Sequence, residues 1–190
     1  RVYLNRAGMT RKTPAHFPIV VCPKGRNTLG DVMFKLNFTF NALVSSGLIM
    51  PREKQQNDGY DRFRERLMFP IRDSEGDVVG FGGRLLTEEE NQPKYLNTSE
   101  SPLFAKRRIL YGLHQNARGI RLREEALIVE GYMDVVGLHQ AGVTNAVATM
   151  GTALTEGHCH QLKARTRNGV TIFHPDKTAP GAWPPPLHMP

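Results

Sequence analysis

A short apolar run that ends on a carboxylate constrains the fold of this chain more than any other feature. Residues 127–129 form the run, Glu130 follows it, Gly131 turns the chain, and Asp134 opens an apolar-periodic stretch. The pattern predicts a buried strand that delivers Glu130 to its carboxyl end, followed by a helix that carries Asp134 in its first turn. In open α/β sheets, ligands bind at that edge.

Two carboxylates at such an edge suit a hard cation such as Mg²⁺, which takes oxygen ligands and is often shared with substrate phosphates. The same residues also have a purely structural interpretation. A glutamate before a glycine is often a solvated turn residue, and an aspartate in a first helical turn often only complements the helix dipole. The spacing of Glu130 and Asp134 leaves both interpretations open.

From residue 126 onward, the periodicity alternates between strands and helices. The expected elements are strand 126–130, helix 132–141, strand 145–149, helix 155–166 and strand 169–173. Such a βαβαβ order predicts an α/β fold with a parallel sheet and right-handed crossovers.

The first half of the chain has a different pattern. Residues 62–73 and 78–84 are separated by a turn signal and predict an antiparallel hairpin. Helical periodicity runs from 31 to 44, and Gly47 is a natural C-terminal stop. A short helix is also expected at 106–112. The chain therefore combines a mixed α/β first part with a parallel α/β second part.

Charge and composition narrow the class of partner. Lys and Arg outnumber Asp and Glu by 25 to 18, which gives a net charge of +7 and a pI near 9.7. This balance favours an anionic partner such as nucleic acid, a nucleotide or a membrane surface. No apolar run approaches the ~20 residues that span a bilayer, and no secretory leader is seen.

The cysteines and histidines form no metal or disulfide framework. Cys22 and Cys159 lie far apart, which fits a reducing compartment, and we expect a cytoplasmic protein. His158, Cys159 and His160 are consecutive, and consecutive side chains of a helix point in different directions. They are therefore not expected to converge on one zinc ion.

The last residues depart from the rest of the composition. Residues 177–190 carry five prolines and the single tryptophan, a composition that can extend neither a helix nor a central strand. We expect a disordered tail. Its abrupt change of character favours a frame-shifted or truncated gene product.

Six segments, taken in order, resemble the polymerase core of bacterial DNA primase, the DnaG family. They are YDRFRERLMFPIRD (60–73), FGGR (81–84), PKYLN (93–97), LYGL (110–113), EGYMDVV (130–136) and AVATMGTALT (146–155). The resemblance covers nearly the whole chain to about residue 173. It implies a basic, template-groove subdomain over residues 1–122, a partial Toprim domain over 123–176 and the tail from 177.

The resemblance also implies roles for single residues. Glu130 matches a metal ligand or general acid/base, Asp134 an acidic residue close to the metals, and Asp176 a further metal ligand. The cofactor would be Mg²⁺ or Mn²⁺. Basic positions that would hold template phosphates or an incoming nucleoside triphosphate are Arg84, Lys94 and Lys106, with Arg64 and Arg66 as weaker candidates. Zinc is expected only in the family's N-terminal module, which has no counterpart here.

The chain departs from the family pattern at named positions. His174 stands where the first aspartate of an Asp-x-Asp pair is expected, and histidine is a poorer Mg²⁺ ligand than carboxylate. Ala7 stands where the family usually has a basic residue. A further acidic pair on the next strand has no counterpart. We therefore expect a primase-core fragment with little or no activity of its own.

The leading expectation is an enzyme that synthesises RNA primers on single-stranded DNA from ribonucleoside triphosphates. The replicative helicase would bind a domain that has no counterpart in this sequence, and no membrane partner is expected. One alternative is another Toprim enzyme, a nuclease or topoisomerase. The other is a non-catalytic remnant that binds single strands through their phosphates and is therefore salt-sensitive.

Overall fold

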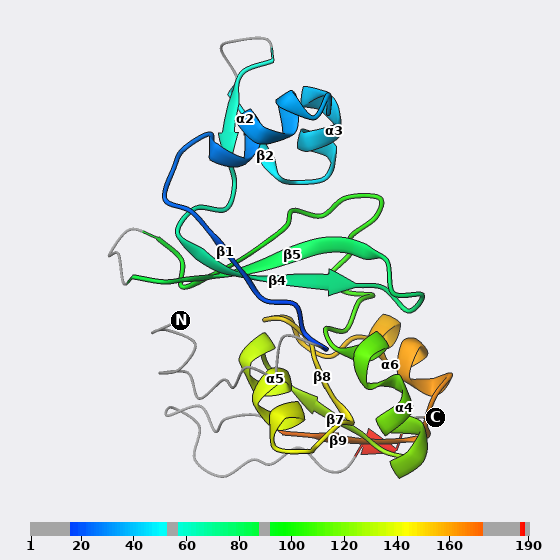
Figure 1. The fold of residues 1–190 in the computed structure, drawn as a ribbon. Coiled ribbons are helices and arrows are strands. Elements are labelled where there is room, and N and C mark those ends of the chain that lie inside the picture. Colours follow the sequence, from blue (N-terminus) through cyan, green and yellow to red (C-terminus); the bar gives the residue numbers. More distant parts are fainter. Residues whose placement is uncertain (1–15, 53–56, 88–91, 173–186, 189–190) are drawn as a thin grey trace. The chain divides into compact units, whose positions relative to one another are not determined.

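The computed structural model describes residues 16–52, 57–87, 92–172 and 187–188 of the 190-residue chain. These residues form two compact units (Figure 1). The antiparallel unit comprises residues 18–71 and 78–104, and the parallel unit comprises the described parts of residues 1–17, 72–77 and 105–190. The chain passes from one unit to the other several times, so neither unit is a continuous segment.

The antiparallel unit is built on a four-stranded sheet with the order β1-β4-β5-β6. Its strands are β1 (Val20–Cys22), β4 (Arg66–Arg72), β5 (Val78–Leu85) and β6 (Tyr95–Asn97). β1 pairs antiparallel with β4, and β5 with β6. Between β4 and β5, one carboxylate oxygen of Asp73 accepts the backbone N–H groups of residues 75–77 and holds the turn. The predicted hairpin is confirmed, although β4 begins four residues later than expected.

Two helices and a small ribbon complete this unit: α2 (Thr28–Lys35), α3 (Phe40–Ser45), β2 (Ile49–Pro51) and β3 (Gly59–Asp61). The single helix expected over 31–44 is wrong because the chain turns between α2 and α3. Asn37 has φ 65°, and its amide and that of Phe38 bond back to the carbonyls of Phe34 and Met33. This hydrogen-bond pattern ends a helix in the left-handed conformation, which asparagine tolerates.

The predicted stop at Gly47 is confirmed. Gly47 has φ 69° and follows the last residue of α3 by two positions. Its N–H bonds to the carbonyl of Val44, and that of Leu48 bonds to the carbonyl of Leu43. Glycine adopts this left-handed conformation without the strain that a Cβ atom imposes.

The parallel unit has the alternating order that the sequence predicted. Its elements are β7 (Ala126–Val129), α5 (Tyr132–Gln140), β8 (Ala146–Ala148), α6 (Glu156–Lys163) and β9 (Asn168–Thr171). β7 lies between β8 and β9 and pairs parallel with both. The predicted α/β fold with a parallel sheet is therefore confirmed, and the strand that precedes Glu130 is the central one of the three.

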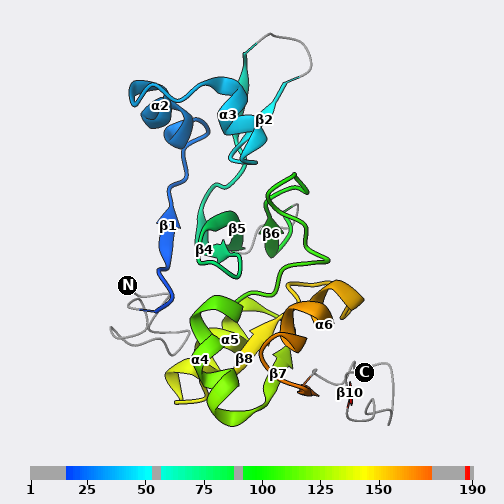
Figure 2. The ribbon, with the colours of Figure 1, turned by 90° about the vertical axis from the view of Figure 1, so that its right-hand side faces the viewer.

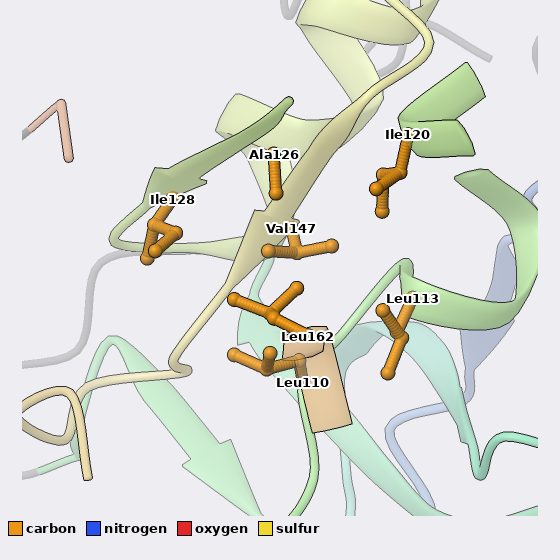
Figure 3. Packing of buried hydrophobic residues seen from close by; sticks show 7 residues of the cluster. All are labelled: Leu110, Leu113, Ile120, Ala126, Ile128, Val147 and Leu162. Atoms are coloured by element: carbon orange, nitrogen blue, oxygen red, sulfur yellow. The ribbon is translucent and has the colours of Figure 1, made fainter. Parts of the chain in front are cut away.

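One face of the parallel sheet packs against two helices. Ala126, Ile128 and Val147 of the strands meet Leu113 and Ile120 of α4 (Leu113–Arg123) and Leu162 of α6, with Leu110 completing the cluster (Figure 3). Alternate strand residues point to the same face, so Ala126 and Ile128 of β7 both enter this cluster. It fixes the sheet whose edge carries Glu130.

α4 was not anticipated. The helix expected at 106–112 is wrong, because that segment forms turns and Tyr111 makes an isolated antiparallel bridge to Ala148. The helix begins only after Gly112, which has φ 83°. At Gly119, a Cβ atom would lie 1.9 Å from the carbonyl oxygen of Thr144. α4 thus packs tightly on the parallel unit, although the predicted boundary after residue 122 assigns it to the first subdomain.

Two residues of the C-terminal segment have regular structure. Leu187 and His188 form β10, which pairs antiparallel with β9 at the edge of the sheet (Figure 2). The expectation of a tail without structure does not hold at these two positions, because β9 offers an edge of unpaired backbone groups. Among the described residues, none of the helices has the length and apolar content that crossing a bilayer requires.

Candidate functional site

The carboxyl edge of the parallel sheet carries the first group of candidate residues. Glu130 directly follows β7. Its backbone carbonyl accepts the N–H of Met150 at 3.1 Å, just beyond the end of β8. On the other side, the N–H of Ile172, just beyond β9, donates to the backbone carbonyl of Ile128 at 2.8 Å. Glu130 therefore lies between the ends of both neighbouring strands.

The side chain of Glu130 is exposed, whereas Ile128 and Val129 immediately before it are buried. This contrast marks the point where β7 leaves the core. An exposed carboxylate at the end of the central parallel strand lies at the edge where ligands bind in open α/β sheets. The structure thus places Glu130 where the sequence pattern put it.

Asp134 lies in the first turn of α5 and is half-buried. One of its carboxylate oxygens accepts the N–H of Gly131 at 3.0 Å, so Asp134 caps its own helix. Asp134 therefore has a structural role at the start of α5. A role in metal binding would fall to the second oxygen of the same carboxylate.

The loop after β8 contributes a feature that the sequence reasoning missed. Met150 and Gly151 both take left-handed φ values, 59° and 81°. Such a conformation is uncommon for methionine and persists only where surrounding contacts enforce it. Here Met150 is buried and donates its N–H to Glu130, and Thr152 donates its hydroxyl to the Thr149 carbonyl. The loop thereby holds the backbone of Glu130.

A complete metal centre is not formed by the described residues, which contain no cluster of three or more His, Cys, Asp or Glu side chains. Asp176 and His174 lie outside the described residues. Mg²⁺ often keeps several waters and binds through one or two carboxylates together with substrate phosphates. Glu130 and the second oxygen of Asp134 are compatible with that mode of binding.

His158 is a structural residue of α6 and not part of a metal centre. It is fully buried, accepts the N–H of Thr155 at Nδ1, and lies 2.6 Å through Nε2 from the carbonyl oxygen of Lys106. This pattern assigns the proton to Nε2. Burial lowers the pKa of His158, and backbone hydrogen bonds at Lys106 and Ile109 partly oppose that shift. The neutral ring joins α6 to the loop that carries Lys106.

Arg66 is a buried residue that links neighbouring segments of the antiparallel unit by hydrogen bonds. It is only 2% exposed, and its guanidinium donates to the carbonyls of Gly83 and Pro93 at 3.3 and 2.9 Å and to the side chain of Gln92. A Cβ atom at position 83 would lie 2.9 Å from Arg66 Cδ, so the glycine makes room for this side chain. Such burial and hydrogen bonding disfavour phosphate binding by Arg66.

The other predicted basic residues are more accessible. The guanidinium of Arg64 lies 5.3 Å from the ring centroid of Tyr60, and that of Arg84 lies 5.6 Å from the ring of Tyr95. Lys94 is exposed beside Tyr95 in the antiparallel unit, and Lys106 is half-buried in the parallel unit.

Arg62 is a charged residue that the sequence reasoning left out. Its guanidinium donates twice to the carbonyl of Asn97, at 3.0 and 2.8 Å, and once to the sulfur of Met50. Burial lowers the pKa of this guanidinium, with Tyr60 opposing the shift. Arg62 joins the β2–β3 ribbon to the end of β6, and only the folded structure reveals this partner.

Comparison with known proteins places these features in a family. The sequence model of the DNA primase catalytic core, N-terminal domain, matches residues 1–117, and that of the Toprim domain matches residues 124–182. The DNA primase of Halalkalibacterium halodurans is 44% identical over 175 residues, which are 91% of this chain and 28% of that protein. The chain therefore spans less than a third of the length of this relative.

Solved structures agree in fold. The DnaG primase catalytic domain bound to ssDNA is 39% identical, with a TM-score of 0.79 over 90% of this chain and 54% of that one. The RNA polymerase domain of Mycobacterium tuberculosis primase DnaG is 33% identical, with a TM-score of 0.84 over 92% of this chain and 58% of that one. The likeness thus extends over both units.

Proposed function

Because this chain belongs to the family of DNA primase catalytic cores, we propose that it takes part in the synthesis of RNA primers on a single-stranded DNA template. The observation that carries this proposal is the exposed carboxylate of Glu130 at the carboxyl end of the central parallel strand. The family match supports this reaction, and the exposed carboxylate supports the sheet edge as its proposed site.

The proposed reaction joins ribonucleoside triphosphates by phosphoryl transfer. When bound, Mg²⁺ or Mn²⁺ neutralises charge on the attacking and leaving oxygens. Glu130 and Asp134 would hold the ion, with Asp176 as a further ligand. The Gly131 N–H donates to the Asp134 carboxylate and the Met150 N–H donates to the Glu130 carbonyl, and these two bonds keep the backbone of this edge in place. A fixed backbone limits the motion of the ligand carboxylates.

The accessible basic residues would hold the polyanionic substrates. We assign Arg64, Arg84, Lys94 and Lys106 to phosphates of the template or of the incoming nucleotide. Such contacts position a nucleic acid without reading its sequence. Arg66 is given a structural role because of its burial and hydrogen bonds. The ssDNA in one related structure supports a single-stranded template as the partner.

His174 sets the expected level of activity. It replaces a carboxylate that the family resemblance places at the metal site, and a neutral or cationic imidazole attracts Mg²⁺ less than an anion does. We therefore propose weak divalent-ion binding and low primer synthesis.

A primer-synthesis assay tests the proposal. The purified chain would be incubated with single-stranded template, ribonucleoside triphosphates and Mg²⁺ or Mn²⁺, beside its His174→Asp variant. We expect few short RNA products from the original chain and more from the variant. His160→Asp is the matched control, since His160 is an exposed residue of α6. Single-strand binding without RNA products from either chain would instead favour the non-catalytic remnant.

The other Toprim enzymes are not favoured. The match to the primase N-terminal catalytic domain covers residues 1–117, which lie outside the Toprim segment. A nuclease or topoisomerase would share only the second match. Cleavage of DNA by the chain in the same assay would reverse this order of candidates.

A further inference from the structure

Tyr60 of β3 lies beside two arginines that come from different parts of the antiparallel unit. The guanidinium carbon of Arg26 is 5.9 Å from the centroid of the Tyr60 ring, and that of Arg64 is 5.3 Å away. Both distances lie within the range of a cation–π interaction. Arg64 follows Tyr60 by only four residues, whereas Arg26 precedes α2, so the tertiary fold brings Arg26 to the ring.

The backbone around Tyr60 is fixed by hydrogen bonds. Tyr60 pairs with Met50 across the β2–β3 ribbon, and the N–H of Asp61 bonds to the carbonyl of Arg26 at 2.9 Å. Asp61 itself is buried and accepts the N–H groups of Leu29 and Gly30 at the start of α2. Neighbouring strand residues point to opposite faces, so Tyr60 points away from this buried carboxylate.

Arg26 and Arg64 differ from the other arginines of the unit. Of the six arginines described there, Arg52 donates to Asp58, Arg62 to Asn97 and Arg66 to Pro93, and Arg84 has further interactions besides Tyr95. Within the described residues, the only interaction of Arg26 and of Arg64 through the guanidinium is with Tyr60. Their N–H groups therefore have no protein acceptor there.

The nearby carboxylates are already engaged. Asp58 forms an ion pair with Arg52, Glu65 forms one with Lys24, and Asp61 caps α2. Arg26 is exposed, and Tyr60 and Arg64 are partly exposed. The two guanidiniums thus present unpaired donors to solvent without an opposing anion from these three residues.

We infer that Tyr60 is a positioning residue that orders Arg26 and Arg64 into one binding site for phosphate groups. A guanidinium stacked on an aromatic ring keeps its edge of N–H donors free, and that edge matches phosphate geometry. Ordering both side chains before binding removes part of the entropy that binding would otherwise lose. The inference deepens the proposed function, on which it rests, by adding Arg26 and Tyr60 to the substrate-binding residues.

The phosphates could come from a single strand or from a nucleoside triphosphate. The full chain and its variants would therefore be tested for binding to an oligo-deoxythymidine strand and, separately, to ATP without template, each at several salt concentrations. The variants are Tyr60→Leu, Tyr60→Phe, Arg26→Gln and Arg64→Gln. Lys35→Gln is the matched control, because Lys35 is an exposed cation at the end of α2.

The expected results distinguish the contribution of the Tyr60 ring to binding from that of the arginine charges. Arg26→Gln and Arg64→Gln each weaken binding about fivefold, and each lowers the slope of log K against log salt by about 0.7 for a single strand. Tyr60→Leu weakens binding about threefold although no charge is lost, and the ring of Tyr60→Phe preserves it. In Tyr60→Leu, removing Arg64 has a smaller effect than in the original chain, because the two residues act together.

Several outcomes would overturn the inference. Unchanged binding in Tyr60→Leu would contradict it. So would fully additive losses of affinity in the variant that combines Tyr60→Leu with Arg64→Gln, or a loss in Lys35→Gln equal to that in Arg26→Gln or Arg64→Gln. Thermal unfolding of Tyr60→Leu distinguishes lost positioning from lost folding, and Tyr60→Phe then remains as the folded comparison. If the original chain binds neither oligonucleotide nor ATP, the proposed function and the inference both fail. If the original chain binds, but the Tyr60, Arg26 and Arg64 variants lose no more affinity than Lys35→Gln, the inference alone fails.

Discussion

The two units each contain a carboxylate at the end of a strand, and they use it in opposite ways. Asp61 ends β3 in the antiparallel unit, is 1% exposed, and accepts two backbone N–H groups of α2 at 2.7 and 2.9 Å. Glu130 follows β7 in the parallel unit and is exposed. The first carboxylate satisfies the otherwise unpaired amides of a helix terminus, and the second is exposed at the edge of the parallel sheet.

The arginines repeat this contrast within the antiparallel unit. Arg66 is buried and donates to backbone carbonyls, whereas Arg64, two residues earlier, is partly exposed and lies against Tyr60. Both residues belong to the same basic segment of the sequence. The lesson is that burial and hydrogen-bond partners, more than residue type, separate charges that support the fold from charges available to a substrate.

Replacing Glu130 with Gln has the largest expected effect and tests its side of the comparison with Asp61. If Glu130 holds the divalent ion, the His174→Asp variant that also carries Glu130→Gln should lose at least about 100-fold in primer synthesis, or roughly 3 kcal/mol of transition-state stabilisation. Its free energy of unfolding should change by less than about 0.5 kcal/mol, since the side chain is exposed. Glu156→Gln, an exposed first-turn residue of α6, is the control. Undiminished synthesis would remove Glu130 from the site.

Replacing Asp61 with Ala tests the opposite role. The change leaves the N–H groups of Leu29 and Gly30 without their acceptor inside the fold, and we expect the free energy of unfolding to fall by about 3 kcal/mol. Urea unfolding followed by circular dichroism measures this loss. Asp31→Ala, at an exposed position of the same helix turn, should change stability by only a few tenths of a kcal/mol. Equal effects of the two substitutions would contradict the assignment.

Substitutions of Arg64 and Arg66 are expected to have smaller effects, and they test the contrast between these two arginines directly. Arg66→Met leaves the carbonyls of Gly83 and Pro93 without a donor, so we expect a loss of about 1.5 kcal/mol in stability. Arg64→Met should leave stability nearly unchanged and weaken single-strand binding. Parallel measurements of unfolding and of binding on both variants decide the matter, and a reversed result would exchange the two roles.

The smallest expected effect is the pH dependence that His158 contributes. Its pKa is lowered in the folded chain by burial, so the unfolded chain binds more protons at pH values below about 6.5. The free energy of unfolding should therefore decline as the pH falls below that value and level off below the folded pKa. Burial also lowers the pKa of His139, with His16 contributing. His158→Gln should reduce the slope, and a slope unchanged by this substitution would contradict the prediction.

The sequence by itself determined the order of strands and helices in the parallel unit. The apolar run before Glu130 and the alternation after it report local periodicity, and local periodicity dictates which elements form. The stop at Gly47 was visible for the same reason. Neither Asn37 nor Met150 carried a comparable signal, because the left-handed conformation of a residue other than glycine depends on contacts that enforce it.

Only the tertiary structure decided which charged residues are available. In the sequence the three arginines between Tyr60 and Arg66 look alike. The fold gives this segment a buried helix cap at Asp61, a buried tether at Arg66 and a partly exposed Arg64 against an aromatic ring. The hydrogen-bond partners of Asp61 and Arg66 lie 17 to 32 positions away in the sequence, as Gly83 and Leu29 show. Hydrogen-bond partners at such separations meet only when the chain folds, and periodicity contains no record of them.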